Sequence, residues 1–231
     1  MKFILATTNK NKLSEINAIA KDYGISFELP QVSLEVDEDG QTLYENALKK
    51  AEFLVGRSRA NASEPVTGNN PLEWKAEPET ECKDYAEPNN SVQLIGLQGN
   101  YYILSDDTGL FVEVLNGVPG VHSARYDTTP EKRIQKLLNA LKNENNRNAK
   151  FLCTMVLLNS NGEILITNTG EIKGTITKST KGLNGFGYDP IFFIEKLNKT
   201  MAQLSKEEKN TISHRAKALI PILKYIKTNI L

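Results

Sequence analysis

The chain has few cysteines, few histidines and no long hydrophobic run. Its 231 residues include two cysteines, Cys82 and Cys153, which provide neither a disulfide framework nor a CxxC metal pair. The two histidines are not at metal-ligand spacing, which argues against zinc. The apolar runs at 151–158 and 218–223 are far shorter than a membrane span, and the N-terminal apolar stretch is too short for a secretion signal. We therefore expect a cytoplasmic protein in a reducing compartment, with no membrane partner.

The chain also lacks an excess of charge, because 28 Lys and Arg balance 28 Asp and Glu. This balance argues against nucleic acid as a partner, since contacts to a phosphate backbone need a basic surplus. Residues 61–90 differ from the rest, with seven acidic residues, two lysines and four of the nine prolines. They have no helical or strand periodicity, which predicts a surface insertion or a mobile lid. The remaining chain has a net charge of +5, a mild bias towards an anionic ligand.

Helical and strand patterns alternate along the chain and indicate one α/β domain over residues 1–231, without a linker or repeat. Residues 3–7 predict a buried strand, and a polar turn then leads into a helix that begins at Asn9 or Lys10. This layout binds phosphate in many proteins, although it also occurs in plain βα units. The other expected elements are helices beginning near Thr42, Thr129 and Ser205, a hairpin over 151–167, and strands over 91–97, 101–105, 111–115 and 191–194. Pro221 is expected to kink or interrupt the last helix.

The adjacent carboxylates of Asp106 and Asp107 are the sharpest chemical feature. The pattern predicts that a strand ends at them, and sites in open α/β sheets usually lie at strand ends. Neighbouring residues on a strand face opposite ways, so one carboxylate can reach a ligand while the other braces the turn; a plain Asp-rich turn is the alternative. The acidic stretch 35–39 predicts either a solvated loop or a contribution to a metal site. Glu38 or Glu45 could complete an oxygen site suited to Mg²⁺.

Two later segments contain residues that could bind a nucleotide base. Phe186 lies between two glycines, where a ring is poorly placed for core packing but well placed for stacking on a ligand. His214 and Arg215 follow Lys209 on the last helix and offer donors to a phosphate or a base carbonyl, unless they form a solvated helix face. With the polar turn and the paired carboxylates, these segments predict a nucleotide site.

This combination resembles the inosine triphosphate pyrophosphatase family, which removes non-standard purine nucleoside triphosphates such as ITP, dITP and XTP. The matching blocks are LATTNKNK at 5–12, EDGQTLYENALKKA at 38–51, SDDTGLFVEVLNGVPGVHSARY at 105–126, GFGYDPIF at 185–192 and KTMAQLSKEEKNTISHRAKAL at 199–219. The chain departs from the family's pattern by an insertion at about 56–100, most irregular at 61–90. The resemblance implies a homodimer of single elongated domains. In each, helices flank a central mixed β-sheet and two lobes surround an active-site cleft.

The resemblance also implies roles for individual residues. Asp107 matches the catalytic acid/base that meets the metal, and Glu38 matches the residue that helps to hold Mg²⁺, with Asp37 and Glu45 as substitutes. The matches to triphosphate-binding residues are Thr7, Thr8, Asn9, Lys12 and Lys50, and Thr108 matches a substrate-contacting hydroxyl. The matches to base-binding residues are Phe186, Gly187, Tyr188, Asp189, Lys209, His214 and Arg215.

The implied reaction is hydrolysis at the α-phosphorus, which gives a nucleoside monophosphate and pyrophosphate. Asp107 takes a proton from the attacking water and Mg²⁺ is the cofactor. One alternative is a related pyrophosphatase for modified pyrimidine or standard nucleotides, against which Phe186 and the His214-Arg215 pair weigh. Another is a nucleotide-binding sensor without turnover, which would not need the residues of a metal centre.

Overall fold

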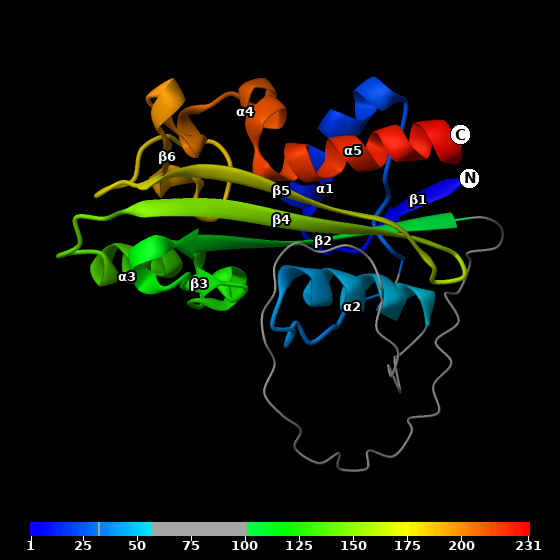
Figure 1. Ribbon diagram of the computed structural model, residues 1–231, viewed down its shortest axis with the longest axis horizontal. Helices are drawn as coiled ribbons and strands as arrows, with labels where there is room; N and C mark the ends of the chain where they lie inside the picture. The colour runs from blue at the N-terminus through cyan, green and yellow to red at the C-terminus, as the bar shows by residue number, and fades with distance from the viewer. Residues whose placement is uncertain (32, 57–100) are drawn as a thin grey trace, which may run out of the picture.

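A mixed β-sheet forms the centre of the computed structural model, which describes residues 1–31, 33–56 and 101–231 (Figure 1). The strands lie in the order β1-β2-β4-β5-β6-β7, with β3 paired to β2. β1 runs parallel to β2, and the other pairs are antiparallel. The strands are β1 (Lys2–Leu5), β2 (Tyr101–Val112), β3 (Pro119–Gly120), β4 (Asn148–Asn159), β5 (Ile164–Ile176), β6 (Phe192–Ile194) and β7 (Lys199–Thr200). The expected α/β class, with helices flanking a mixed central sheet, is confirmed.

The helices begin at residues whose side chains cap them. The N-cap residues are Asn9 for α1 (Lys10–Ala20), Thr42 for α2 (Leu43–Val55), Thr129 for α3 (Pro130–Ala140), Ser205 for α4 (Lys206–Ile212) and Ser213 for α5 (His214–Asn229). Each cap accepts a hydrogen bond from a backbone N–H that has no partner within its helix. The four helix starts expected from the sequence are confirmed, and Ser213 adds a fifth.

β2 is longer than its sequence pattern predicts. We expected a strand to end before Asp106, a turn to follow and a new strand to begin at Phe111. Instead the ladder with β4 runs unbroken from Tyr102 to Val112 and includes both aspartates. Because β4 pairs with every residue of this stretch, the backbone stays extended where polar residues suggested a turn. The two carboxylates therefore lie within a strand, not at its end.

The last helical region divides at Ser213 and not at Pro221. Ser213 has an extended backbone (φ −64°, ψ 157°), and its side chain accepts from the N–H of Ala216 to start α5. Pro221 lies inside α5 without ending it. A proline removes the N–H that would bond to the carbonyl four residues earlier. That carbonyl, of Lys217, accepts instead from Nδ2 of Asn168 on β5 at 3.0 Å, so the sheet replaces the lost bond.

The predicted hairpin is confirmed and extends beyond its expected ends, since β4 pairs with β5 over almost the whole length of both strands. The insertion expected at about 56–100, its role as a lid at 61–90 and the strand expected over 91–97 lie outside the described residues.

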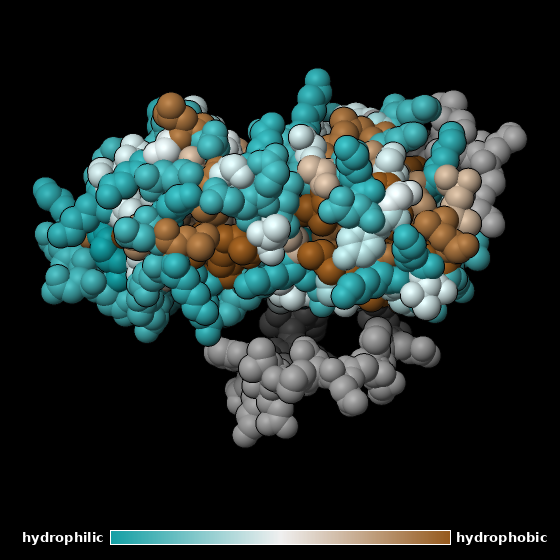
Figure 2. Space-filling view, turned by 90° about the horizontal axis from the view of Figure 1, so that it is seen from above, coloured by the Kyte–Doolittle hydropathy of each residue, from teal (hydrophilic) through white to brown (hydrophobic). Residues whose placement is uncertain are grey.

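Helices cover both faces of the sheet. Figure 1 shows α1, α4 and α5 on one side, and α2 and α3 on the other. One cluster of buried apolar side chains joins α1 and α5 to the sheet, a second includes α3, and a third lies under α2. Seen over α4 and α5, the surface is mainly hydrophilic with small hydrophobic patches between (Figure 2). None of the helices in the described ranges has the length and hydropathy that a membrane crossing requires.

Candidate active site

The candidate site lies at the edge of β2 between β1 and β3. β1 pairs with β2 as far as Leu104, and β3 pairs with it from Leu110. At one end of this interval the carbonyl of Leu104 accepts from the N–H of Ala6 at 2.8 Å. At the other end the N–H of Leu110 donates to Ser123 Oγ at 2.8 Å. Between them, at 105–109, no strand in the described part of the chain covers this edge, and both aspartates lie in the interval.

Asp106 faces α1 and α5, where two cations meet it. Lys12 Nζ donates to its carboxylate at 3.0 Å, and the Arg215 guanidinium lies 3.6 Å away. Thr108 Oγ1 donates to the same carboxylate at 3.3 Å. Burial alone would raise the pKa of Asp106, but the charges of Lys12 and Arg215 outweigh it and hold the pKa well below its usual range. Asp106 is therefore an ionised counter-ion that joins two cations of the site.

Asp107 faces the opposite side of the sheet, towards α2. Asn46 Nδ2 donates to its carboxylate at 3.1 Å, and Lys50 Nζ lies 3.5 Å from its other oxygen. Burial raises the pKa of Asp107, and the nearby charge of Glu38 adds to the rise, while Lys50 and Lys12 oppose it. A carboxylate whose pKa is raised towards neutral pH is a better proton acceptor than an ordinary aspartate.

Glu38 lies on the far side of Lys50 from Asp107. Lys50 Nζ donates to it at 2.9 Å, and Arg125 is 3.9 Å away. Burial would raise the pKa of Glu38, but Lys50 lowers it below the usual value. Glu45 instead accepts from backbone N–H groups at the start of α2, and Asp37 is exposed without a bonded partner among the described residues. Of the three expected acidic residues, Glu38 is the one that shares a cation with Asp107.

These two carboxylates fit a magnesium site. Within the described ranges, no three His, Cys, Asp or Glu side chains come together as a metal centre. Mg²⁺, however, is commonly held by one or two carboxylates together with waters and substrate phosphates. Glu38 and Asp107 flank the same ammonium group, and the charge of Glu38 raises the pKa of Asp107, an effect that a divalent cation would relieve. Their chemistry suits such an ion.

The expected phosphate-binding turn lies at the N-terminus of α1. Asn9 Oδ1 accepts from the N–H groups of Asn11 at 2.9 Å and Lys12 at 3.4 Å, and Thr7 Oγ1 accepts from the N–H of Asn9 at 3.2 Å. Thr8 is exposed on this turn. The positive end of the helix dipole and the Lys12 ammonium thus lie together, an arrangement that favours anions.

The ring of Phe186 lies beneath two cations. Lys209 Nζ is 4.8 Å and the Arg215 guanidinium 5.6 Å from the ring centroid. Asp189 fixes the loop, because its carboxylate accepts from the N–H of Phe186 at 2.8 Å and from Lys209 Nζ at 2.7 Å. Gly185 has φ +76°, and a Cβ there would lie 2.1 Å from the Asp189 carboxylate, so the loop needs glycine at this position. Phe186 and Lys209 are thus connected through Asp189.

Two other residues expected at the base have buried side chains. The His214 ring stacks on Phe151 with centroids 4.7 Å apart, and burial holds its pKa well below 6.5, so the imidazole is neutral. The Tyr188 hydroxyl donates to the carbonyl of Ser123 at 3.0 Å, and its ring packs in the cluster that includes α3. Neighbouring Gly187 has φ +62°. A contact of Tyr188 with a base would therefore involve its backbone.

The Ham1 family model matches residues 3–225. The chain belongs to the Ham1 family. It is 40% identical over 230 residues to the dITP/XTP pyrophosphatase of Leuconostoc mesenteroides, covering 95% of this chain and 93% of that protein. It is 37% identical to the dITP/XTP pyrophosphatase of Aquifex aeolicus, covering 98% and 97%. Among solved structures, a HAM1 protein from Coxiella burnetii matches with a TM-score of 0.71 at 31% identity, and the Staphylococcus aureus Ham1 protein with 0.68 at 30%, each covering 98% of both chains.

The sequence analysis of this Ham1-family chain missed two residues that position the site. Glu15 accepts from Lys209 at 2.6 Å and from Arg215 at 2.5 Å, and so holds both cations near Phe186. Asn46 holds Asp107 and also accepts from the N–H of Gly40 at 2.8 Å. Glu15 follows Lys12 by three residues on α1, a spacing that places both on one helix face and could have identified it.

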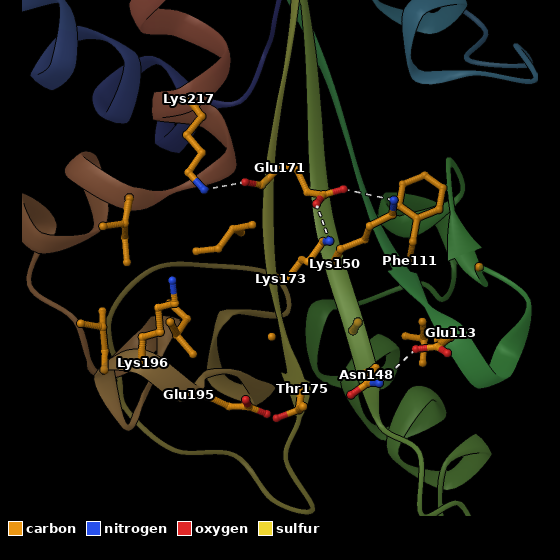
Figure 3. Close-up of a pocket in the computed structure, with 18 of the residues that line it drawn as sticks. Phe111, Glu113, Asn148, Lys150, Glu171, Lys173, Thr175, Glu195, Lys196 and Lys217 are labelled. Atoms are coloured by element: carbon orange, nitrogen blue, oxygen red, sulfur yellow. Dashed lines mark hydrogen bonds and ion pairs between the residues drawn. The ribbon is translucent and has the colours of Figure 1, made fainter. Parts of the chain in front are cut away.

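The candidate site does not coincide with a cavity of about 1010 Å³ that lies farther along β4 and β5 (Figure 3). None of the site residues expected from the sequence lines this cavity. Its central carboxylate, Glu171, lies 3.1 Å from Lys150 and 3.6 Å from Lys173, and Lys217 donates to the Glu171 carbonyl at 2.7 Å. Three of its lysines are thus bound to the protein itself.

Proposed function

We propose that this chain hydrolyses the non-standard purine nucleoside triphosphates ITP, dITP and XTP to the nucleoside monophosphate and pyrophosphate. One observation carries the proposal. Asp107, whose pKa is raised, lies next to Asp106 on β2. Asp106 in turn contacts Lys12 at the expected phosphate-binding turn and Arg215, one of the two cations above the aromatic ring. The names of the relatives from Leuconostoc mesenteroides and Aquifex aeolicus support the substrate class. The proposal includes a cytoplasmic homodimer that acts on the nucleotide pool.

In this proposal the triphosphate binds along the turn at 7–12. The positive end of the α1 dipole and the Lys12 ammonium face its phosphates, and Lys50 approaches them from α2. Thr108 offers a hydroxyl on the Asp106 side of β2, where it donates to the Asp106 carboxylate at 3.3 Å. Lys12 is already held by Asp106 at 3.0 Å, so the cation is in position before the substrate arrives.

Glu38 and Asp107 would hold Mg²⁺ beside the triphosphate. When bound, the ion supplies charge neutralisation at the phosphate oxygens. Asp107 accepts a proton from the attacking water, whose oxygen forms a bond to the α-phosphorus. The bond from that phosphorus to the bridging oxygen breaks, and pyrophosphate leaves with the bonding electrons. Asn46 keeps the Asp107 carboxylate oriented during this step.

The purine stacks on Phe186, and Lys209 and Arg215 direct donors at its 6-keto oxygen. Neutral His214 lies beside them at the start of α5. ATP has an amino group at position 6, so its donors would face the donors of the protein. Polar mismatches of this kind discriminate by factors of roughly 10⁴. The proposal therefore places selectivity in these cations and in Glu15, which holds them.

The catalytic role is tested with Asp107→Asn. The variant should bind ITP with near wild-type affinity but lose about 10²–10⁴-fold in kcat, the usual contribution of a general base. Asp127→Asn is a matched control and should leave kcat unchanged, because the Asp127 carboxylate accepts only from neighbouring Thr128 among the described residues. Near-normal turnover by Asp107→Asn would contradict the assigned role, and binding without any turnover by the wild type would favour a sensor.

A further inference from the structure

The Tyr188 hydroxyl connects two walls of the candidate site. It donates to the carbonyl of Ser123 at 3.0 Å, and the two residues are only 5% and 6% exposed. A hydrogen bond in such surroundings is strengthened by the low local dielectric, and removing its donor leaves a buried carbonyl without a partner. The bond joins the turn that carries Phe186 to the segment that follows β3, two parts that lie 65 positions apart in sequence.

On one side of this bond, the backbone near Ser123 is firmly attached to β2. Ser123 Oγ accepts from the N–H of Leu110 at 2.8 Å and donates to the carbonyl of Gly120 at 2.6 Å. A Cβ on Gly109 would lie 2.6 Å from the same carbonyl, so the backbones of β2 and β3 are in direct contact. The segment 119–125 is therefore held together and against β2 by these contacts, and it ends at Arg125.

On the other side, Tyr188 belongs to the tight turn that presents Phe186. The N–H of Asp189 donates to the carbonyl of Phe186 at 3.3 Å, and the Tyr188 carbonyl accepts from the N–H of Ile191 at 3.0 Å. Only Gly187 separates the two aromatic residues. A shift of the Phe186 backbone when a purine stacks on the ring would therefore reach Tyr188.

Arg125 extends the connection to the carboxylate proposed to hold magnesium. Its guanidinium lies 3.9 Å from Glu38 and 3.4 Å from Nδ1 of His122, and its side chain is 41% exposed. At 3.9 Å this ion pair is longer than a hydrogen bond, so its strength depends on where segment 119–125 holds the arginine.

We propose that Tyr188 is a positioning residue that couples purine recognition to the metal and phosphate side of the site. Through its hydrogen bond to Ser123, the position of the Phe186 turn sets the position of Arg125 beside Glu38. The inference rests on the proposed function, because it takes Phe186 as the platform for the base. A correctly stacked purine would then raise kcat in addition to lowering KM.

Tyr188→Phe removes only the hydroxyl and tests the coupling kinetically. We expect kcat for ITP to fall about five- to tenfold while KM stays within about twofold, as for the loss of one buried hydrogen bond that acts in the transition state. Tyr126→Phe is the matched control: Tyr126 packs against the same core cluster, and its hydroxyl has no bonded partner among the described residues. Identical kinetics of the two variants, or a lower melting temperature of Tyr188→Phe without a change in kcat, would overturn the inference.

Hydrogen exchange with inosine separates this inference from the proposed function. Inosine offers the base without phosphates, so protection of amides at 185–189 reports purine binding alone. The wild type should also gain protection at 119–125, and Tyr188→Phe should gain it only at 185–189. Protection at 185–189 without protection at 119–125 in the wild type would overturn the coupling and leave the function intact. No protection at either segment of the wild type would refute the base platform itself.

Discussion

Replacing each of the two adjacent aspartates of β2 by asparagine should have opposite consequences for stability and turnover. Asp106 is fully buried and ionised, with Lys12 at 3.0 Å and Arg215 at 3.6 Å. Asp107 has a raised pKa, which means that its ionised form is less favourable in the folded protein than in the unfolded chain. Asp106→Asn should therefore destabilise the fold strongly, whereas Asp107→Asn should cause no loss or a small gain.

The magnitude follows from the ion pairs of Asp106. Removing one partner of a buried ion pair costs about 3–5 kcal/mol, because the other charge stays buried without compensation. Asparagine keeps one acceptor oxygen, so the lower value of about 3 kcal/mol is expected. In a protein of this size that loss corresponds to a fall in melting temperature of about 6–12 °C. Asp107→Asn should melt within a few degrees of the wild type while losing most of its turnover.

The pH dependence of the two effects differs. The folded pKa of Asp106 is depressed, so its contribution to stability is complete above the ordinary aspartate pKa and constant between about pH 5 and 8. The folded pKa of Asp107 is raised, so wild-type stability falls relative to Asp107→Asn as pH rises through that pKa. Thermal unfolding of the three proteins followed by far-UV circular dichroism at several pH values measures both trends. Equal melting temperatures for the two variants, or a larger loss for Asp107→Asn, would refute the assignment of the two charges.

Two further substitutions test the positioning of Lys209 and Arg215, the two cations proposed to contact the base. Glu15→Gln should cost about 2–3 kcal/mol of stability by removing charged hydrogen bonds to Lys209 and Arg215, and should raise KM for ITP. Glu28→Gln, at an exposed residue, should change neither quantity, and equal behaviour of the two variants would contradict this role. Gly170→Ala would place a Cβ 2.1 Å from the first carbonyl of α5, so it should lower both melting temperature and turnover. A melting temperature and turnover equal to those of the wild type would show that α5 need not contact β5 at this position.

The sequence predicted local features well, because their causes lie within a few residues. The caps at Asn9, Thr42 and Ser205 are set by a side chain and an N–H two or three positions away. The opposite orientations of Asp106 and Asp107 also follow directly from the alternation of a strand. The resemblance named residues from five separate parts of the chain. The fold brings most of them towards one edge of β2, whereas the side chains of Tyr188 and His214 pack in the core.

The features that the sequence did not predict depend on partners far along the chain. β2 continues through its two aspartates because β4 pairs with it, and no local signal reveals that partner. Pro221 stays inside α5 because Asn168 on β5 satisfies the carbonyl it leaves free. Glu15 bonds to residues about 200 positions away, and these partners, Lys209 and Arg215, come within reach only when α1, α4 and α5 pack together.

Pyrophosphate release from ITP, XTP, GTP and ATP, measured with Mg²⁺ and again with EDTA, tests the central claim most directly. The proposed chemistry predicts metal-dependent release from ITP and XTP and little from GTP or ATP. Binding of ITP without release would contradict an enzymatic role. Equal release of pyrophosphate from ATP and ITP would contradict the proposed recognition of the purine by Lys209 and Arg215.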